Sequence, residues 1–444
     1  MKLWDKHMKT DELIEQFTVG NDRELDMYLA PFDILGSMAH IKMLESIGLL
    51  TKDEWQTLQK ELVKIYRKTE DRTFIIEDEV EDVHTQVELM LTRELGDTGK
   101  KIHAARSRND QVILDIKLYI RNELQQIVEM VQHLFDILIS MSEKYKDLLL
   151  PGYTHFQVAM PSSFGLWFAS YAESLADDMH IMAGAYRITD QNPLGSAAGY
   201  GSSFPINREY TTRLLGFSEM NYNVQYAQMT RGKTERVVAY SLSLLSGTLS
   251  KLAGDVCLFS NQNFGFLTLP DEFTTGSSIM PHKKNPDVFE LVRGRCNKIQ
   301  ALPNEIEYIT INLPPGYNRD MQIVKETFIP AVNEAKNCIN ILTYAIDKLV
   351  PAQDILDDEK YSHIFSVEEV NKLVINGMPF RDAYKKVAAD IAGGSYKPDH
   401  TVKHSHEGSA GNLCNDKIVQ KMKEVIKQFD FETKDKALKN LLKL

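Results

Sequence analysis

Four polar segments of this 444-residue chain concentrate side chains that bind anions or move protons. The first, Gly276–Pro286, reads GSSIMPHKKNP and joins two hydroxyls, two ammonium groups and an amide to a flexible start. Such a loop can close over a carboxylate, because lysine neutralises the charge and hydroxyls or backbone N–H groups bond the oxygens. An ordinary Gly/Ser connector with solvated lysines has the same composition, so composition alone leaves both interpretations open.

The second segment, Gly152–Gln157 (GYTHFQ), lies at a Pro-Gly break between two long helical patterns. If His155 is held there between packed helices, with Thr and Gln beside it, it can carry a proton near neutral pH. A lone histidine is more often a structural residue. The segment therefore indicates a candidate proton carrier and a structural alternative.

The third segment, Arg106–Gln111 (RSRNDQ), opens the first long helical pattern, and its guanidinium and amide donors suit bidentate carboxylate recognition. A capped helix start with salt-bridged arginines is the alternative. The fourth segment runs from Pro314 to Lys325 and supplies a phenol, amides and cations after a proline turn. A plain interhelical loop explains it equally well.

Long helices must position these segments, because the helix-breaking residues Gly and Pro are rare in the stretches that separate the segments. Lys100–Leu150 contains no Gly or Pro, and its apolar residues recur at steps of four and three, which predicts one helix with a bundle-packing stripe. Further helices are predicted at Ser162–Gln191 opened by Pro161, at Thr230–Asn263, after Pro286 with a kink at Pro303, and at Met321–Leu349. We find no convincing strand pattern. The fold class is predicted to be all-α, a long central helical bundle flanked by two smaller, mostly helical domains.

Three domains are expected, with boundaries at residues 1–109, 110–350 and 351–444. The first holds shorter helices such as Lys52–Thr69 and Glu79–Leu95, the second is the bundle and the oligomerisation domain, and the third is a small helical domain. In the third, Ser366–Glu369 fits a capping box that opens a helix. Gly393–Gly411 is polar and contains three histidines, but no Cys or carboxylate pattern accompanies them. We therefore predict a solvated loop there and no metal site.

Composition narrows the class of protein. The chain is 43% hydrophobic and 25% charged, which suits a large folded interior, and its net charge of −11 has the wrong sign for general binding to nucleic acid or anionic membranes. Four cysteines lack CxxC spacing and are expected to be reduced. No secretion signal is visible at the N-terminus, and no long uncharged apolar stretch occurs. We expect a cytoplasmic protein without nucleic-acid or membrane partners.

Together the segments resemble the argininosuccinate lyase family of the fumarase/aspartase superfamily. GSSIMPHKKNPD is similar to the superfamily's shared loop, with a KKNPD ending typical of this family, and ARSRNDQV and GYTHFQ match its other two blocks in the same chain order. The resemblance implies a C–N lyase that splits argininosuccinate into arginine and fumarate by anti elimination, the last step of arginine biosynthesis. It implies no metal and no cofactor.

The resemblance also assigns residues. Ser277 takes the base position, Lys283 and Asn285 hold the carboxylate whose charge grows, and His155, oriented by Glu290, is the candidate acid for the leaving nitrogen. The opposite assignment, with His155 as acceptor and Ser277 as donor, stays open. Gly20 stands where the family often has a substrate-contacting serine. The substrate-binding positions are Ser107, Arg108, Asn109, Thr154, Asn285, Tyr317, Gln322, Lys325, His84 and Arg236.

By the same resemblance we expect a homotetramer in which each site is built from three subunits. Two rivals remain. A sister enzyme, adenylosuccinate lyase, shares the elimination and usually has a KRNP-type ending; His282 mildly favours it. The other rival is a catalytically silent helical protein of the delta-crystallin kind. The joint presence of Ser277, His155, Glu290, Lys283 and Asn109 disfavours a silent scaffold.

Overall fold

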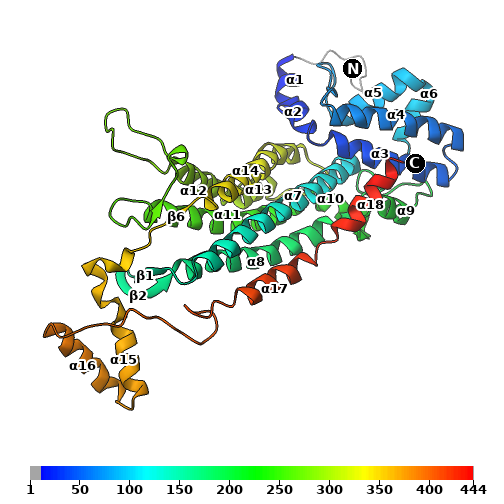
Figure 1. Ribbon diagram of the computed structural model, residues 1–444. Helices are drawn as coiled ribbons and strands as arrows, with labels where there is room; N and C mark the ends of the chain where they lie inside the picture. The colour runs from blue at the N-terminus through cyan, green and yellow to red at the C-terminus, as the bar shows by residue number, and fades with distance from the viewer. Residues whose placement is uncertain (1–11, 444) are drawn as a thin grey trace.

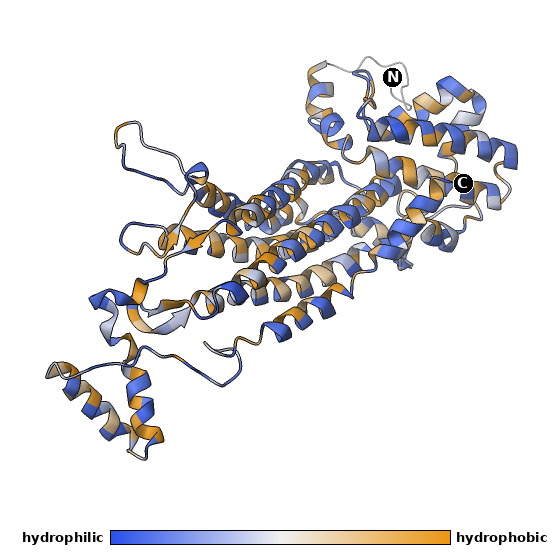
Figure 2. Cartoon of the chain, viewed as in Figure 1, coloured by the Kyte–Doolittle hydropathy of each residue, from blue (hydrophilic) through white to orange (hydrophobic). Residues whose placement is uncertain are grey.

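The computed structural model describes residues 12–443, and its longest helices run side by side as one bundle (Figure 1). Their apolar faces meet in one continuous core that includes Leu138, Phe168, Leu245 and Ile339 (Figure 2). The predicted all-α class is confirmed. The bundle helices are α7 (Arg108–Lys144), α8 (Phe164–Thr189), α11 (Lys233–Phe259), α12 (Asp287–Ile299), α13 (Leu302–Thr310) and α14 (Ile323–Ile346).

Helix α7 begins later than the predicted Lys100–Leu150 span, because Lys101–His103 form a separate 3₁₀ turn. A capping box fixes its start. The Ser107 hydroxyl accepts a hydrogen bond from the Asn109 N–H (3.3 Å), and the Asp110 carboxylate accepts one from the Ser107 N–H (2.9 Å). At about 1.5 Å per residue, the 37 residues of α7 extend for about 55 Å.

A β-hairpin follows α7, where the sequence predicted no strand. Strands β1 (Leu149–Thr154) and β2 (Gln157–Ser163) pair antiparallel, with Thr154 opposite Gln157. His155 and Phe156 form the turn with φ of 53° and 57°, the left-handed conformation of two-residue hairpins. The prediction was wrong because two prolines and a glycine obscure the alternation. Pro161 lies in β2 rather than opening α8, and Ser163 caps α8 instead.

The predicted kink at Pro303 is a full break, since α12 ends at Ile299 and α13 begins at Leu302 with Pro303 in its first turn. The remaining strands are two-residue pairs that pin loops to the bundle. β3 pairs with β4 in parallel and β5 with β6 in antiparallel orientation. These strands are β3 (Gln191–Asn192), β4 (Glu219–Met220), β5 (Leu267–Thr268) and β6 (Val350–Pro351).

A second core lies at the end of the bundle where α7 begins. It packs short helices around α3, and buried residues such as Met38 and Trp55 belong to it. The two predicted helices in this region are confirmed, although the second begins at Val83 rather than Glu79. The helices are α1 (Glu12–Val19), α2 (Asp22–Asp26), α3 (Ala30–Ser46), α4 (Lys52–Glu70), α5 (Val83–Leu95) and α6 (Asp97–Lys100), with α9 (Arg208–Leu214) and α10 (Val224–Met229) from the loops after α8.

Beyond the bundle, α15 (Ser366–Ile375) and α16 (Phe380–Ala392) form a small separate pair. The predicted capping box is wrong, because Phe365 occupies the N-cap position and makes no side-chain cap. Gly393–Gly411 is a loop as predicted, in which His404 contacts Ser409 and Glu368. Then α17 (Asn415–Ile426) packs along α8, and α18 (Phe431–Leu441) reaches α3 and α9. The boundaries at residues 109 and 350 stay a prediction.

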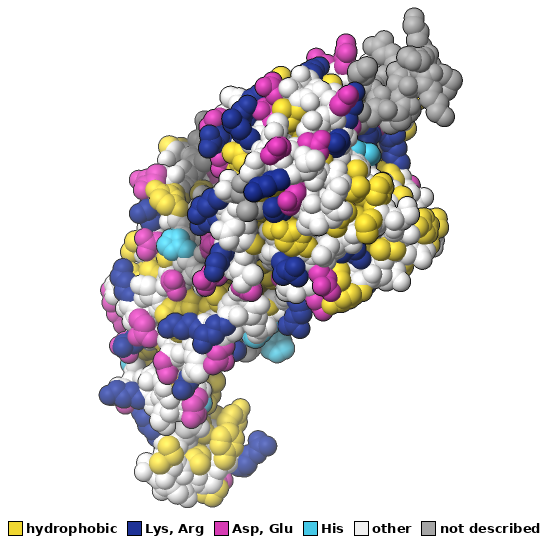
Figure 3. Space-filling view, turned by 90° about the vertical axis from the view of Figure 1, so that its right-hand side faces the viewer, with side chains coloured by type: hydrophobic (Ala, Val, Ile, Leu, Met, Phe, Trp, Pro, Cys, Tyr) yellow, Lys and Arg dark blue, Asp and Glu magenta, His cyan; other side chains and the backbone are white. Residues whose placement is uncertain are grey.

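One described helix, α11, is long and apolar enough to cross a bilayer by length and composition, and it packs inside the bundle against α8, α12 and α14. The four cysteines are free, as predicted. On the face drawn in Figure 3, acidic and basic side chains are intermixed over the described residues rather than gathered by sign.

Gly165 fixes how the hairpin joins α7 to α8. A Cβ at this position would lie 2.5 Å from the Lys146 Cα and 2.8 Å from the Ser142 carbonyl oxygen. We expect Gly165→Ala to lower the free energy of unfolding by about 1–3 kcal/mol, because backbone atoms cannot move aside cheaply. The matched control is Gly184→Ala in the same helix, where a Cβ meets nothing within 4 Å. It should stabilise the fold by about 0.5–1 kcal/mol. Thermal and denaturant unfolding of both variants measure the difference.

Candidate active site

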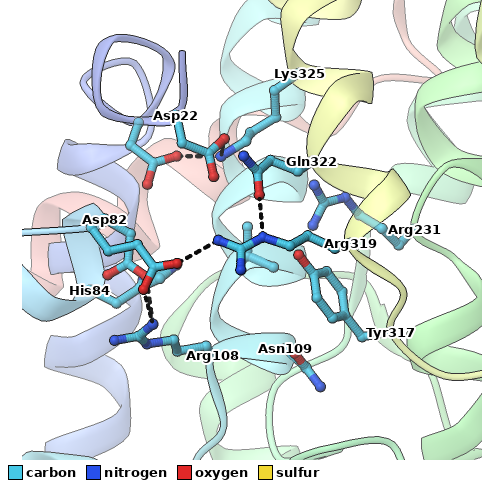
Figure 4. A pocket seen from close by; sticks show the side chains of 13 residues that line it. Asp22, Asp82, His84, Arg108, Asn109, Arg231, Tyr317, Arg319, Gln322 and Lys325 are labelled. Atoms are coloured by element: carbon cyan, nitrogen blue, oxygen red, sulfur yellow. Dashed lines mark hydrogen bonds and ion pairs between the residues drawn. The ribbon is translucent and has the colours of Figure 1, made fainter. Parts of the chain in front are cut away.

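One cavity of about 270 Å³ lies at the end of the bundle where α7 begins, and it brings together six of the predicted site residues (Figure 4). Segments of α2, α5, α7 and the α13–α14 connection form its walls. We call it the charged pocket, because its lining contains four acidic and five basic or histidine side chains. It is lined by Asp22, Asp26, Glu81, Asp82, His84, Arg108, Asn109, Val112, Arg231, Tyr317, Arg319, Gln322 and Lys325.

The first turn of α7 presents Arg108 and Asn109 to the pocket. Arg108 forms ion pairs with Asp82 (3.1 Å) and Glu81 (3.5 Å) and donates a hydrogen bond to the Thr85 hydroxyl (2.6 Å). Ser107 also stands here, but it acts as the N-cap of the helix. The capped, salt-bridged helix start is therefore confirmed, and the same turn lines the pocket, while carboxylate recognition by this segment stays a prediction.

The α13–α14 connection supplies the opposite wall. Arg319 bonds Glu81 through Nη2 (2.5 Å) and the Gln322 side-chain oxygen through Nε (3.1 Å). Gln322 in turn donates to the carbonyl oxygens of Thr18 and Val19, at 3.0 and 3.1 Å. These bonds tie the connection to α1 and orient the guanidinium of Arg319 across the cavity. The predicted Tyr317 lies beside it and is half-exposed.

His84 lies at the back of the pocket inside a buried ionic cluster. Its Nδ1 is 2.8 Å from an Asp33 oxygen and 3.5 Å from an Asp115 oxygen. Burial opposes a charged imidazole, but the two carboxylates outweigh it and raise the pKa of His84 to about 9. Arg106 is buried beside the same carboxylates. The donor atoms of Asp33, His84 and Asp115 lie within 4.8 Å of one another, a spacing that also suits a cation. However, the imidazolium of His84 already supplies a positive charge there, and burial together with Asp33 raises the pKa of Asp115 well above its usual range.

This cluster predicts a pH-dependent stability. Because the pKa of His84 is about 9 in the fold against 6.5 for the free side chain, its contribution is complete below pH 6.5 and is lost as the pH rises through 9. The shift corresponds to about 3 kcal/mol. We expect the free energy of unfolding to fall by about this amount between pH 6.5 and 9.5, and the fall to vanish in His84→Gln. Denaturant titrations of both proteins at the two pH values test it; an equal fall in both would contradict the assignment.

Thr154 and His155 do not reach this pocket. They lie at the tip of the β1–β2 hairpin, beyond the opposite end of α7 and so about 55 Å from Asn109 along that helix. His155 is exposed in the turn, so the helices of its own chain do not enclose it. The cause is the hairpin itself, which carries the histidine past the helix ends. Its left-handed backbone is a strained conformation of the kind found at functional sites.

The serine loop, Gly276–Pro286, is separate from both the charged pocket and the hairpin tip. Backbone bonds between Thr275 and Asn285 close its base, and Lys283 is exposed beyond them. The Ser277 Oγ accepts hydrogen bonds from the N–H groups of Ile279 (3.3 Å) and Met280 (3.1 Å). Two amides aimed at this oxygen would stabilise negative charge on it.

Two more predicted residues have other neighbours in this chain. Glu290, on α12, pairs with Arg293 at 4.0 Å, and no bond joins it to His155 among the described residues. Arg236 pairs with Glu307 at 3.3 Å and lines a neighbouring cavity rather than the charged pocket. A single chain therefore presents three incomplete sets of the predicted residues, at the pocket, the hairpin tip and the serine loop.

Seven of the thirteen lining residues were not among the predicted site residues, and four of these carry charges from segments not assigned to the site or, for Arg319, from the fourth polar segment. Asp22 and Asp26 stand four apart on α2, a spacing that places both carboxylates on one helix face. Arg319 lies inside the fourth polar segment but was not singled out, and Arg231 precedes α11. The sequence analysis considered Gly20 but not the two acidic residues that follow it at positions 22 and 26. The helical spacing of that pair was the available signal.

The sequence is similar to those of known proteins over most of its length. A family of lyases matches residues 5–301. The argininosuccinate lyase of Parabacteroides distasonis is 61% identical over 99% of both chains. The argininosuccinate lyase of Thermotoga neapolitana is 40% identical over 87% of this chain and 97% of its own. The chain belongs to the argininosuccinate lyase family. The resemblance drawn from the four segments is thereby confirmed, and as a member of this family the chain is a C–N lyase.

Among solved structures, a variant of EDDS lyase with bound fumarate superposes with a TM-score of 0.76. It covers 98% of this chain and 95% of its own at 20% identity. At that identity the likeness shows the fold alone. It confirms the long-helix bundle as the fold of this chain.

Proposed function

We propose that this chain cleaves argininosuccinate to arginine and fumarate, the last step of arginine biosynthesis, in the cytoplasm. The observation that carries the proposal is the charged pocket in a chain 61% identical to argininosuccinate lyases. The substrate has three carboxylates, one ammonium group and one guanidinium. A pocket that mixes arginine, lysine and carboxylate side chains has a partner of opposite sign for each of these groups.

The reaction removes a proton from the carbon next to a carboxylate and breaks a C–N bond on the neighbouring carbon. The electron pair left by the proton forms the aci-carboxylate and then the fumarate double bond, while the leaving nitrogen keeps the bonding pair and gains a proton. Ser277 and His155 are the two proton-transfer groups, with Glu290 behind His155. The base is Ser277 or His155, and the other residue is the acid. Lys283 and Asn285 stabilise the extra negative charge.

The remaining predicted residues bind substrate. His84, Arg108, Asn109, Tyr317, Gln322 and Lys325 share the charged pocket, which supports a common role. Ser107 caps α7 at the edge of that pocket, and Thr154 sits beside His155. Arg236 lies in the adjoining cavity, which shares Arg231 with the pocket. The chain needs no metal or cofactor in this proposal.

The site is completed by association of several chains. Three incomplete sets of residues in one chain support a homotetramer in which the charged pocket, the hairpin tip and the serine loop of different subunits meet. An exposed, strained histidine and an exposed serine loop fit surfaces that a neighbouring subunit covers.

The test is direct. Purified chain is mixed with argininosuccinate, and fumarate is followed by its ultraviolet absorbance. Release of fumarate supports the proposal, whereas turnover of adenylosuccinate alone supports the sister enzyme. A well-folded oligomer that forms no product from either compound supports the silent structural alternative.

A further inference from the structure

Two carboxylates in the charged pocket share one lysine. Asp22 and Asp26 lie one turn apart on α2, and their Oδ1 atoms are 2.7 and 2.6 Å from the Lys325 Nζ. Burial raises the pKa of Asp22 to about 6, against the opposing attraction of Lys325. One lysine needs only one carboxylate as a counter-charge. The second is therefore available for another cation.

The two carboxylates differ in what else they do. Asp26 is 3% exposed, and its second oxygen accepts a hydrogen bond from the Val83 N–H (3.2 Å), so it joins α2 to α5. Asp22 is 14% exposed and has no hydrogen-bond or ion-pair partner besides Lys325 among the described residues. Asp26 thus has a structural task, whereas Asp22 offers a carboxylate oxygen to the cavity.

Asp22 also stands at a particular end of the cavity. Figure 4 places Asp22 and Lys325 opposite Asn109, with Arg319 and Tyr317 between them. As part of this inference, the reacting carbons are placed at the Asn109 end of the pocket. The Asp22 end then receives the far end of the arginine half, which carries an α-ammonium and an α-carboxylate group. Lys325 can bind the α-carboxylate, but as a cation it cannot bind the ammonium.

We propose that Asp22 binds the α-ammonium group of the arginine half and so selects an α-amino acid at this end of the pocket. The inference rests on the proposed function and adds a specificity residue to it. When the ammonium binds, Asp22 exchanges part of its contact with Lys325 for the ligand. Lys325 keeps Asp26 and turns its free donors to the α-carboxylate. The Asp22 carboxylate accepts the hydrogen bonds of the ammonium group, so the pocket needs no further residue for this pair.

The test compares two ligands that differ only by the group in question, L-arginine and 5-guanidinopentanoate, which lacks the α-amino group. Calorimetry or competition against turnover gives both affinities. We expect wild type to prefer arginine by at least about tenfold, the worth of a charged hydrogen bond. Asp22→Asn should remove this preference. Asp26→Asn is the matched control; it loosens the same Lys325 and should weaken both ligands by the same factor.

Opposite results are equally clear. Asp22→Asn protein that still prefers arginine, or that loses both ligands equally, overturns the proposal. Melting curves establish folding, and Asp22→Ser replaces Asp22→Asn should the latter not fold. The two levels of inference separate cleanly. Wild-type protein that releases no fumarate from argininosuccinate refutes the proposed function. Wild-type protein that releases fumarate yet binds both ligands equally refutes only the role of Asp22.

Discussion

Ser277→Ala is expected to lower kcat for argininosuccinate on the order of 10³-fold, the scale of a lost proton-transfer group. The side chain lies on an exposed loop closed by backbone bonds between Thr275 and Asn285, and among residues 12–443 its Oγ forms hydrogen bonds only with amides of its own loop. Removing it therefore leaves the bundle core untouched. Steady-state fumarate release and a melting curve of the same sample measure the two effects together.

Ser278→Ala is the matched control for this experiment. It removes a neighbouring hydroxyl from the same loop, for which no hydrogen bond is found among the described residues, so its kcat should stay within about threefold of wild type. Near-normal kcat in Ser277→Ala would remove this serine from proton transfer. A large loss in both variants would instead indicate that loop shape, rather than one hydroxyl, limits the reaction.

Mixing two inactive variants is expected to restore activity. Asn109→Ala damages the charged pocket, and His155→Ala damages the hairpin tip at the other end of α7. If each site takes these two residues from different subunits, random reassembly at equal amounts leaves about a quarter of the sites with both residues intact. Activity should rise from a background on the order of 10²-fold below wild type to about a quarter of it.

This experiment is informative only if the two variants exchange subunits. The two proteins are dissociated, mixed and refolded together, and a sample mixed without dissociation serves as the control. Restored activity only after reassembly supports sites shared between chains. Reassembled mixtures that stay at background would show that one chain supplies both residues, which conflicts with the roughly 55 Å that α7 places between them.

The sequence predicted the long helices well because their apolar stripes and breakers are strong local signals. Lys233–Phe259 and Ile323–Ile346 lie within the expected spans, each a few residues shorter at its ends. The hairpin was missed because its strands contain Pro151, Gly152 and Pro161, which local patterns associate with loops. Only pairing between the two strands, a nonlocal property, makes them β structure.

The same difference between local and nonlocal signals explains which residues of the candidate site were predicted. Residues of one polar segment, such as Arg108 and Asn109, were found together because their helix places them together. Asp22 and Arg319 were missed, since their importance arises only when α2 and the α13–α14 connection meet at the start of α7. His155 shows the converse. Its residue type was recognised in the sequence, but its surroundings depend on a turn that no composition reveals.

The single straight α7 has a consequence for damage and for control. If its first turn lines one catalytic centre and the hairpin at its far end enters another, the helix fixes the positions of residues in two centres. An axial slip by even one residue would then misalign both simultaneously. Substitutions near the middle of α7 should therefore lower the activity of two catalytic centres at once. A molecule that binds against the middle of this helix and shifts it would inhibit both centres through one binding event.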